Sequence, residues 1–205
     1  MLFRLVRVLL WLIISVLSIR GIRKSRIANK GLASILAIIM SLGLVAISSI
    51  FPFENLFISF KSPEGVFNYA NYGQISGIAY GKDSCMVIFS NFDNTNACYF
   101  MPKSEKGYKI PYHFSSKKIS NRFVGDGLFQ IYRVNGTDDY YLFGMTTTSS
   151  KSMVILNNQG KLIENVFIIG EHSIGNTYIF YEYIECYTED YYIVINGEKV
   201  PMAGN

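Results

Sequence analysis

Acidic side chains are missing from the first fifty residues of this chain, although fifteen Asp and Glu follow from Glu54 onward. The same fifty residues contain seven Lys and Arg side chains, which give this segment a formal charge of +7. Residues 51–205 carry the other twelve basic side chains and all fifteen acids, so their formal charge is −3. The net charge of +4 therefore belongs to the N-terminal segment, and the acidic remainder is not expected to bind nucleic acid.

Cysteine is scarce as well. The three thiols are Cys85, Cys98 and Cys186, and an odd number leaves at least one unpaired. If residues 84–90 and 96–101 form a hairpin, its register offsets Cys85 from Cys98 by roughly 13 Å along the ladder. A disulfide requires Cα atoms closer than about 7 Å. We therefore predict no disulfide in this hairpin and expect buried free thiols.

The motifs of metal centres and of common hydrolases are also missing. His113 and His172 are the two histidines, and neither a His-x-x-x-His nor a Cys-x-x-Cys spacing occurs. The sequence contains no Gly-x-Ser-x-Gly and no Gly-rich phosphate loop. We therefore predict no metal, no cofactor and no enzymatic activity.

Acidic side chains of the C-terminal part cluster in two places. These are Asp138 with Asp139, and Glu182, Glu185, Glu189 and Asp190. The alternating ligand spacing of a calcium loop is missing, which favours solvated turns. A carboxylate pair for glycoside cleavage stays open as an alternative, because such pairs are assembled in space.

Two apolar stretches fill most of the first fifty residues and predict membrane helices at about 3–19 and 32–51. Twenty residues rise about 30 Å as a helix, which matches the hydrocarbon thickness of a bilayer. Pro52 marks the outer end of the second helix. The flank after the first stretch is basic and lacks the small residues of a signal-peptide cleavage site, so we expect the stretch to be retained.

The connector at 20–31 sets the expected orientation. Its cations are Arg20, Arg23, Lys24, Arg26 and Lys30. Under the positive-inside rule this loop stays cytoplasmic, which places residues 52–205 outside the cytoplasm. The same orientation follows if the first stretch only lies on the membrane.

One face of the first stretch is more polar than the rest. At helical spacing it gathers Arg4, Arg7, Trp11, Ser15 and Ser18. The second stretch has a face of small residues, Ser34, Ala37, Ser41 and Ser48. Small faces let membrane helices approach closely, so the two faces predict a spanning hairpin. The alternative is a first helix lying in the headgroup plane. We favour the hairpin because the polar arc is thin.

The remaining residues predict one β-rich domain that opens with a short helix. Ser62 as N-cap and Pro63 at the first helical position predict a helix at 63–70. Eleven strands are predicted from Tyr-, Phe-, Ile- and Val-rich runs between turn clusters, at 74–80, 84–90, 96–101, 107–113, 119–124, 128–134, 140–146, 152–157, 161–169, 177–185 and 191–195. Such spacing indicates an all-β fold, an antiparallel β-sandwich or barrel-like sheet.

An internal similarity links two segments of this domain. Residues 128–142 align without gaps to residues 179–193, and both contain the pattern Thr-x-Asp-Tyr-Tyr. The similarity indicates either a duplicated hairpin or two hairpins whose turns have converged.

The order of motifs resembles small membrane-anchored proteins of Gram-positive type. It comprises a membrane span, a Ser-Pro-Glu helix opening at Ser62, a Cys-containing strand, Gly-Tyr-Lys-Ile-Pro from Gly107, and Tyr-Arg-Val-Asn-Gly-Thr-Asp-Asp-Tyr-Tyr from Tyr132. The resemblance covers most of residues 52–199. It implies an extracytoplasmic β-rich domain and supplies no catalytic residues.

Tyrosine offers the best candidate for a binding surface, because exposed aromatic rings bury area with few rotors. All fifteen tyrosines lie from Tyr69 onward, and the paired ones are Tyr140, Tyr141, Tyr191 and Tyr192. We expect these four to face a ligand or partner and most others to be core. The predicted function is an extracytoplasmic, non-enzymatic binding module for a membrane or cell-envelope protein or glycan.

Two alternatives stay open. One is an accessory subunit of a membrane complex that acts through the Trp11, Ser15 and Ser18 stripe. The other is a cell-wall-directed ectoenzyme that uses Glu182, Glu185, Asp190 and a histidine.

Overall fold

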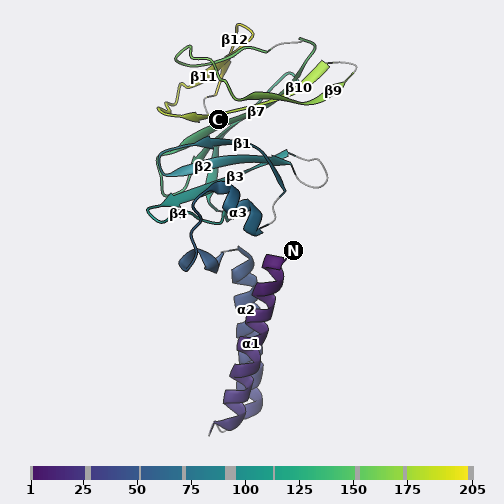
Figure 1. Ribbon diagram of the computed structural model, residues 1–205, viewed down its shortest axis with the longest axis vertical. Helices are drawn as coiled ribbons and strands as arrows, with labels where there is room; N and C mark the ends of the chain where they lie inside the picture. The colour runs from purple at the N-terminus through teal and green to yellow at the C-terminus, as the bar shows by residue number, and fades with distance from the viewer. Residues whose placement is uncertain are drawn as a thin grey trace.

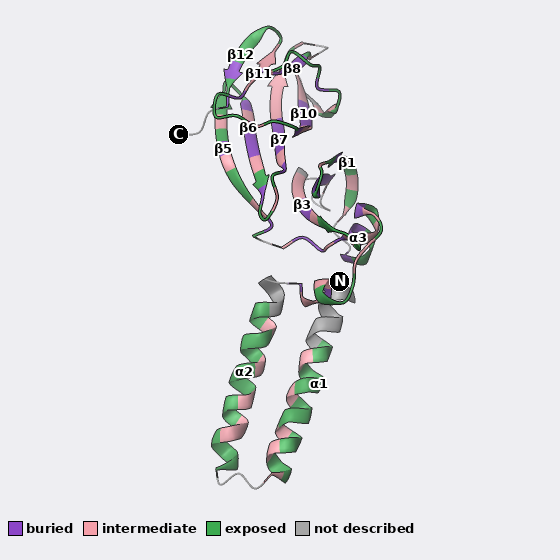
Figure 2. Cartoon of the chain, turned by 90° about the vertical axis from the view of Figure 1, so that its left-hand side faces the viewer, coloured by how far each residue is buried: buried purple, intermediate pink, exposed green. Residues whose placement is uncertain are grey.

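The computed structural model describes residues 2–25, 29–50, 52–70, 73–90, 96–112, 114–150, 153–172 and 175–202. It has a helical stem and a β-rich domain above it (Figure 1). The stem helices are α1 (Leu2–Lys24) and α2 (Lys30–Ile50), which lie side by side and antiparallel (Figures 1 and 2). The start of α1 lies at the domain end, where it contacts α3 (Pro63–Ala70).

The two stem helices pack through one face each. The half-buried residues of α1 recur every three or four positions, at Trp11, Ser15, Ile19 and Ile22. Those of α2 are Ala33, Ser34, Ala37, Ser41 and Val45. Ser18 was expected on this face but is exposed, because Ile19 continues the helical spacing from Ser15. The side chains of Arg4, Arg7 and Ser48 lie outside the described residues.

The serine hydroxyls on the packed faces donate hydrogen bonds to backbone carbonyls of their own helices. Ser15 Oγ donates to the Trp11 carbonyl at 2.7 Å, and Ser41 Oγ donates to the Ala37 carbonyl at 2.8 Å. The outward faces are Leu, Ile and Met side chains, most of them exposed. The polar face predicted for α1 therefore packs against α2, with Trp11 and Ser15 half-buried.

One described helix is long and apolar enough to cross a membrane, over Lys30–Ile47 in α2. Helix α1 is of similar length, but Arg20, Arg23 and Lys24 lie in its last two turns and shorten its apolar run. The expectation of two such helices is thus met by α2 alone.

The β domain contains three antiparallel sheets. The first has the order β1 (Gln74–Tyr80), β2 (Ser84–Ser90), β3 (Asn96–Ser104) and β4 (Gly107–Tyr108). The second is β5 (Ser116–Val124), β6 (Gly127–Val134), β7 (Tyr140–Thr148), β10 (Gly175–Ile184) and β9 (Val166–His172). The third is β12 (Glu198–Pro201), β11 (Tyr192–Ile195) and β8 (Ile155–Asn157).

The sheets stack in layers along the long axis, with α3 beneath the first (Figures 1 and 2). Strand β2 explains the stacking, because its side chains alternate between two cores. Val87 and Phe89 pack with Phe67 of α3, whereas Met86 and Ile88 pack with the second sheet. The second sheet is covered on its other face by the third. The predicted antiparallel β-rich domain is confirmed as three stacked sheets, and the finer choice between a β-sandwich and a barrel-like sheet stays a prediction.

Some predicted strands end elsewhere. The strand expected at 107–113 stops after Tyr108, and the one expected at 161–169 begins at Val166. Before Val166, the chain makes a turn closed by an isolated bridge between Leu156 and Leu162. Helix α3 and strands β1 and β2 have the predicted bounds.

The internal similarity is not a duplicated hairpin. Residues 128–142 form the β6–β7 hairpin, but residues 179–193 run from β10 into β11, which belongs to another sheet. The two segments share a core position instead, since the rings of Phe129 and Phe180 lie 5.8 Å apart.

The three cysteines are free. Cys85 pairs with Met101 and Cys98 with Ile88 across the β2–β3 ladder, so the thiols are offset as predicted. Cys85 is buried and Cys98 half-buried, but Cys186 is exposed, which corrects the expectation of burial for that thiol.

Candidate functional site

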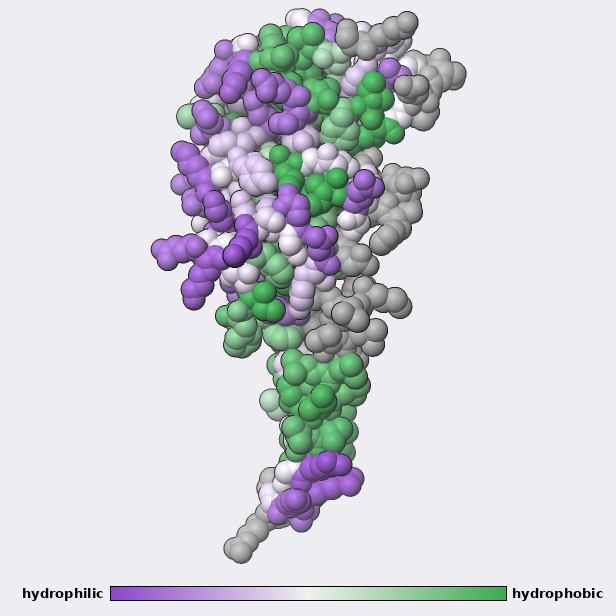
Figure 3. Space-filling model, in the orientation of Figure 1, coloured by the Kyte–Doolittle hydropathy of each residue, from purple (hydrophilic) through white to green (hydrophobic). Residues whose placement is uncertain are grey.

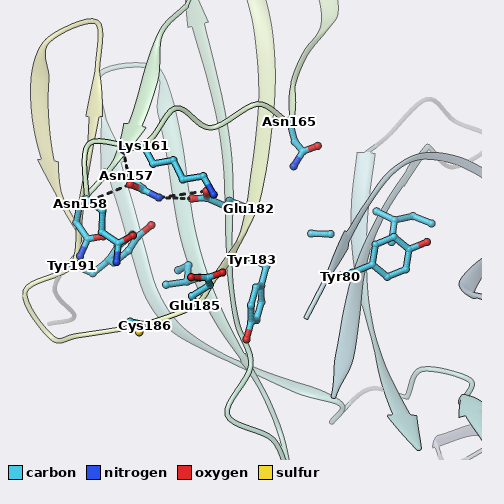
Figure 4. A pocket seen from close by; sticks show the side chains of 14 residues that line it. Tyr80, Asn157, Asn158, Lys161, Asn165, Glu182, Tyr183, Glu185, Cys186 and Tyr191 are labelled. Carbon is cyan, nitrogen blue, oxygen red and sulfur yellow. Dashed lines mark hydrogen bonds between the residues drawn. The ribbon is translucent and has the colours of Figure 1, made fainter. Parts of the chain in front are cut away.

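A cleft with a polar lining lies at the edge of β10. Strand β9 pairs with β10 only as far as Phe180, so residues 181–184 have no strand partner on that side. The backbone carbonyl of Asn165, just before β9, accepts the backbone N–H of Tyr181 at 3.1 Å. The pairing of β9 with β10 ends there. Beyond this point a cleft of about 400 Å³ opens between β10, the end of β1 and the 157–165 segment (Figure 4).

Polar side chains from three separate segments line this cleft. The amides are Asn157, Asn158, Gln159 and Asn165, the charged groups Glu182, Glu185 and Lys161, and the aromatic rings Tyr80, Tyr183 and Tyr191. Figure 4 shows Asn157, Lys161 and Glu182 close together, with Tyr80 on the opposite wall. Two carboxylates against one ammonium give the lining a formal negative charge.

Glu182 is the central carboxylate of the cleft. It is half-buried on β10 between the core residues Phe180 and Ile184. Asn157 Nδ2 lies 3.4 Å from its Oε1 and 3.5 Å from its Oε2. Burial raises the pKa of Glu182 above its usual 4.5, and nearby Glu185 raises it further, although Asn157 and Lys161 oppose the shift. This carboxyl therefore takes up a proton more readily than an exposed glutamate.

Asn157 is held in place by its own turn. Its Oδ1 accepts the backbone N–H groups of Gln159 at 3.1 Å and Lys161 at 3.0 Å. This Asx-type turn fixes the side chain and directs Nδ2 toward Glu182. The sequence predicted a turn at these residues but gave no sign of its contact with β10.

Asp139 is a buried carboxylate that contacts Tyr183, a residue of the cleft lining. It is 1% exposed and accepts the backbone N–H of Asp83 at 2.8 Å and Ser84 Oγ at 2.6 Å. Burial, followed by the charge and hydrogen bond of Asp139, raises the pKa of Tyr183 to about 12. Tyr183 therefore presents a neutral hydroxyl at ordinary pH.

The solvated turn expected at Asp138 and Asp139 is half correct. Asp138 is exposed and forms an ion pair with Arg133 at 2.9 Å. Asp139 instead points into the interface between the first and second sheets, where it binds the β1–β2 turn. The two adjacent acids precede β7, and successive side chains of an extended chain point to opposite sides. The side chain of Asp138 therefore faces solvent and that of Asp139 faces the sheet interface.

The four paired tyrosines do not form a surface. Tyr141 is 0% exposed and Tyr191 1% exposed, so both are core residues. Tyr140 stacks on Tyr187 with centroids 4.8 Å apart, and Tyr192 lies under Lys199 Nζ at 3.7 Å. Alternation along a strand separates neighbours onto opposite faces, which the prediction overlooked. Of the four, Tyr191 lines the cleft.

The candidate acids of an ectoenzyme are brought together only in part. Glu182 and Glu185 line the same cleft, but Asp190 is exposed outside it. His113 and the side chain of His172 lie outside the described residues. Within the part of the chain that the structure describes, no three His, Cys, Asp or Glu side chains gather as metal ligands.

The basic side chains lie at the end of the stem farthest from the β domain. Arg20, Arg23, Lys24 and Lys30 are exposed there, and Figure 3 shows a hydrophilic tip below a hydrophobic band. Lys30 Nζ donates to the Arg23 carbonyl at 3.0 Å and so joins the two helix ends. Arg26 lies outside the described residues.

Comparison with protein-family models, with curated proteins and with solved structures finds no match to this chain. The resemblance to small membrane-anchored proteins therefore has no counterpart among these comparisons, and the function is argued from the geometry.

Proposed function

We propose that this protein is a two-pass membrane protein whose extracytoplasmic β domain binds a polar, hydroxyl-bearing ligand of the cell envelope in the β10 cleft. The charge distribution supports the orientation. The basic tip and the β domain lie at opposite ends of an apolar stem, so a cytoplasmic tip places the domain across the membrane.

The stem helices support two crossings. Helix α2 has 21 residues, about 32 Å, which is enough to cross the hydrocarbon layer, and α1 packs antiparallel beside it with its basic last turn at the tip. Because α1 packs its more polar face on α2, its outward face is the apolar one that lipid requires.

The lining of the cleft favours a glycan over an anionic ligand. Amide and carboxylate side chains offer donors and acceptors that suit neighbouring hydroxyls, and the tyrosine rings offer an apolar surface for a sugar face. The excess negative charge disfavours phosphate or carboxylate ligands. The observation that carries the proposal is Glu182, half-buried in the cleft and held by Asn157.

Binding of cell-wall glycan fragments to the intact, detergent-extracted protein tests the proposal. We expect Glu182→Gln and Asn157→Ala to weaken binding by about tenfold or more, which is about 1.4 kcal/mol. Glu198→Gln is the matched control, because Glu198 is exposed on β12 and does not line the cleft. Equal binding by all three variants, or no binding by the parent protein, would exclude the cleft as a glycan site.

A second candidate function is acid-assisted glycan cleavage. Its support is the raised pKa of Glu182, caused first by burial, together with a second carboxyl, Glu185, in the same cleft. Release of reducing ends from cell-wall glycan distinguishes the two functions. Cleavage that is lost in Glu182→Gln while the variant still binds glycan indicates an enzyme, and binding without cleavage by the parent indicates a binding module.

A further inference from the structure

Two large apolar side chains protrude from the segment that joins the stem to the β domain. Leu56 is 79% exposed and Phe57 is 83% exposed, and Ile58 beside them is partly exposed. They lie at the end of the short 3-10 helix η1 (Phe53–Leu56), which follows α2. Figure 1 shows this helix at the base of the β domain, beside the top of the stem.

The segment is fastened to the domain, so these side chains have a fixed direction. Asn55 Nδ2 donates to the Ile110 carbonyl at 2.9 Å, and the Ile110 N–H returns a bond to Asn55 Oδ1 at 2.8 Å. Lys109 Nζ donates to the Asn55 carbonyl at 2.6 Å. Phe60 and Tyr108 exchange backbone hydrogen bonds of 2.9 and 2.8 Å. Five hydrogen bonds, all at Asn55 or Phe60, hold this segment on the domain.

An aromatic contact between α1 and η1 fixes the position of η1 along the stem axis. The rings of Trp11 and Phe53 lie 6.1 Å apart in an edge-on arrangement. Trp11 belongs to α1. Helix α2 ends at Ile50, and Phe53 lies three residues later. Tryptophan is enriched at the boundary between hydrocarbon and headgroups. Leu56 and Phe57 follow Phe53 within about one turn, so they lie at this boundary.

We propose that Leu56 and Phe57 insert into the outer interfacial layer of the same bilayer that holds the stem, and so seat the base of the domain on the membrane. This inference depends on the membrane placement in the proposed function. Figure 3 shows hydrophobic surface at the domain base next to the hydrophobic stem, which gives the continuity that a lipid contact needs. A stable protein partner buries about 800 Å² on each side, more than this short turn presents.

Depth-dependent quenching on the intact protein in phosphatidylethanolamine–phosphatidylglycerol vesicles tests the inference. The background is Cys186→Ser, which removes the exposed thiol, and the unlabelled background supplies the blank. An environment-sensitive fluorophore is placed at Phe57→Cys, at Ile39→Cys on the outward face of α2, and at Phe123→Cys, 70% exposed on β5. We expect lipids spin-labelled near the headgroup to quench position 57, and lipids labelled deep in the acyl chain to quench position 39, with neither quenching position 123.

The outcomes separate the inference from the anchor. Quenching at position 39 without quenching at position 57 overturns the membrane contact of η1 and leaves the anchor intact. No quenching at position 39 overturns the anchor, and with it this inference. A second reporter, at Lys61→Cys, keeps Leu56 and Phe57 native. Its quenching by headgroup spin labels should be lost when both are replaced by Ser, and quenching that persists would also overturn the proposal.

Discussion

Ser84 Oγ donates a hydrogen bond of 2.6 Å to Asp139 Oδ2 in the buried interface between the first and second sheets. Two backbone N–H groups of the β1–β2 turn, from Lys82 and Asp83, also donate to this carboxylate. A charged group buried in this way is stable only while its partners are present. Asp139 thus joins the first and second sheets, as does the hydrogen bond of 2.8 Å between Ser84 Oγ and Tyr141 Oη.

Replacement of Asp139 by Ala should lower the free energy of unfolding by about 3 kcal/mol, because the buried Ser84 hydroxyl and the backbone N–H groups of Lys82 and Asp83 lose their acceptor. Chemical denaturation of the intact protein in detergent measures the loss. Asp138→Ala is the control, since Asp138 is exposed, and should change stability by less than about 0.5 kcal/mol. Equal effects at both positions would contradict the assigned role of Asp139.

Gly144 of β7 should not tolerate a side chain. A Cβ at this position would meet the ring of Phe180 on the neighbouring strand. We expect Gly144→Ala to destabilise the protein by about 1–3 kcal/mol through overpacking. Adding Phe180→Leu should give a double variant whose loss is smaller than the sum of the two single losses, because the smaller side chain relieves the clash. Additive losses would show that the two positions do not interact.

Glu182 should make the protein less stable as pH rises. Burial raises its pKa in the folded state above the usual 4.5, so the folded state binds more protons than the unfolded state in this range. Stability should therefore fall as pH increases from about 4.5 through the folded-state pKa. Glu182→Gln should remove this decline, and under the proposed function it should also weaken glycan binding. Thermal unfolding at a series of pH values checks this, and an unchanged pH slope in the variant would refute it.

The thiols should differ sharply in reactivity. Burial raises the pKa of Cys85 to about 12 and that of Cys98 to about 11, so little thiolate forms at either near pH 8. Cys186 is exposed. We expect alkylation of the folded protein to modify Cys186 alone, and all three after unfolding, as counted by mass spectrometry. Rapid modification of Cys85 in the folded protein would contradict its burial.

Local sequence signals predicted the parts of the fold that they determine. The Ser-Pro-Glu opening gave the bounds of α3, and apolar runs between turns gave those of β1 and β2. Strand β12 was missed because Val200 is its single buried residue, and its conformation depends on pairing with β11. Such a strand has no pattern of its own to detect.

The candidate site could be predicted only in part. Glu182 and Glu185 were noted as acids, but their common cleft depends on where β9 stops pairing with β10, which is a tertiary feature. Asn157 looked like an ordinary turn residue because its partner, Glu182, is 25 positions away. The tyrosine pairs misled the prediction because composition shows aromatic content without its direction.

Labelling of Cys186 in whole cells tests the central claim, the orientation of the chain, most directly. A membrane-impermeant maleimide should label Cys186 on intact cells, because this thiol is exposed on the domain that the proposed orientation places outside. In a second protein, Cys186→Ser with Asn29→Cys, the thiol lies next to the basic tip and should be labelled only after permeabilisation. The opposite result would be that Cys186 is protected until lysis while Asn29→Cys is labelled on intact cells. This result would show the opposite orientation and contradict the account.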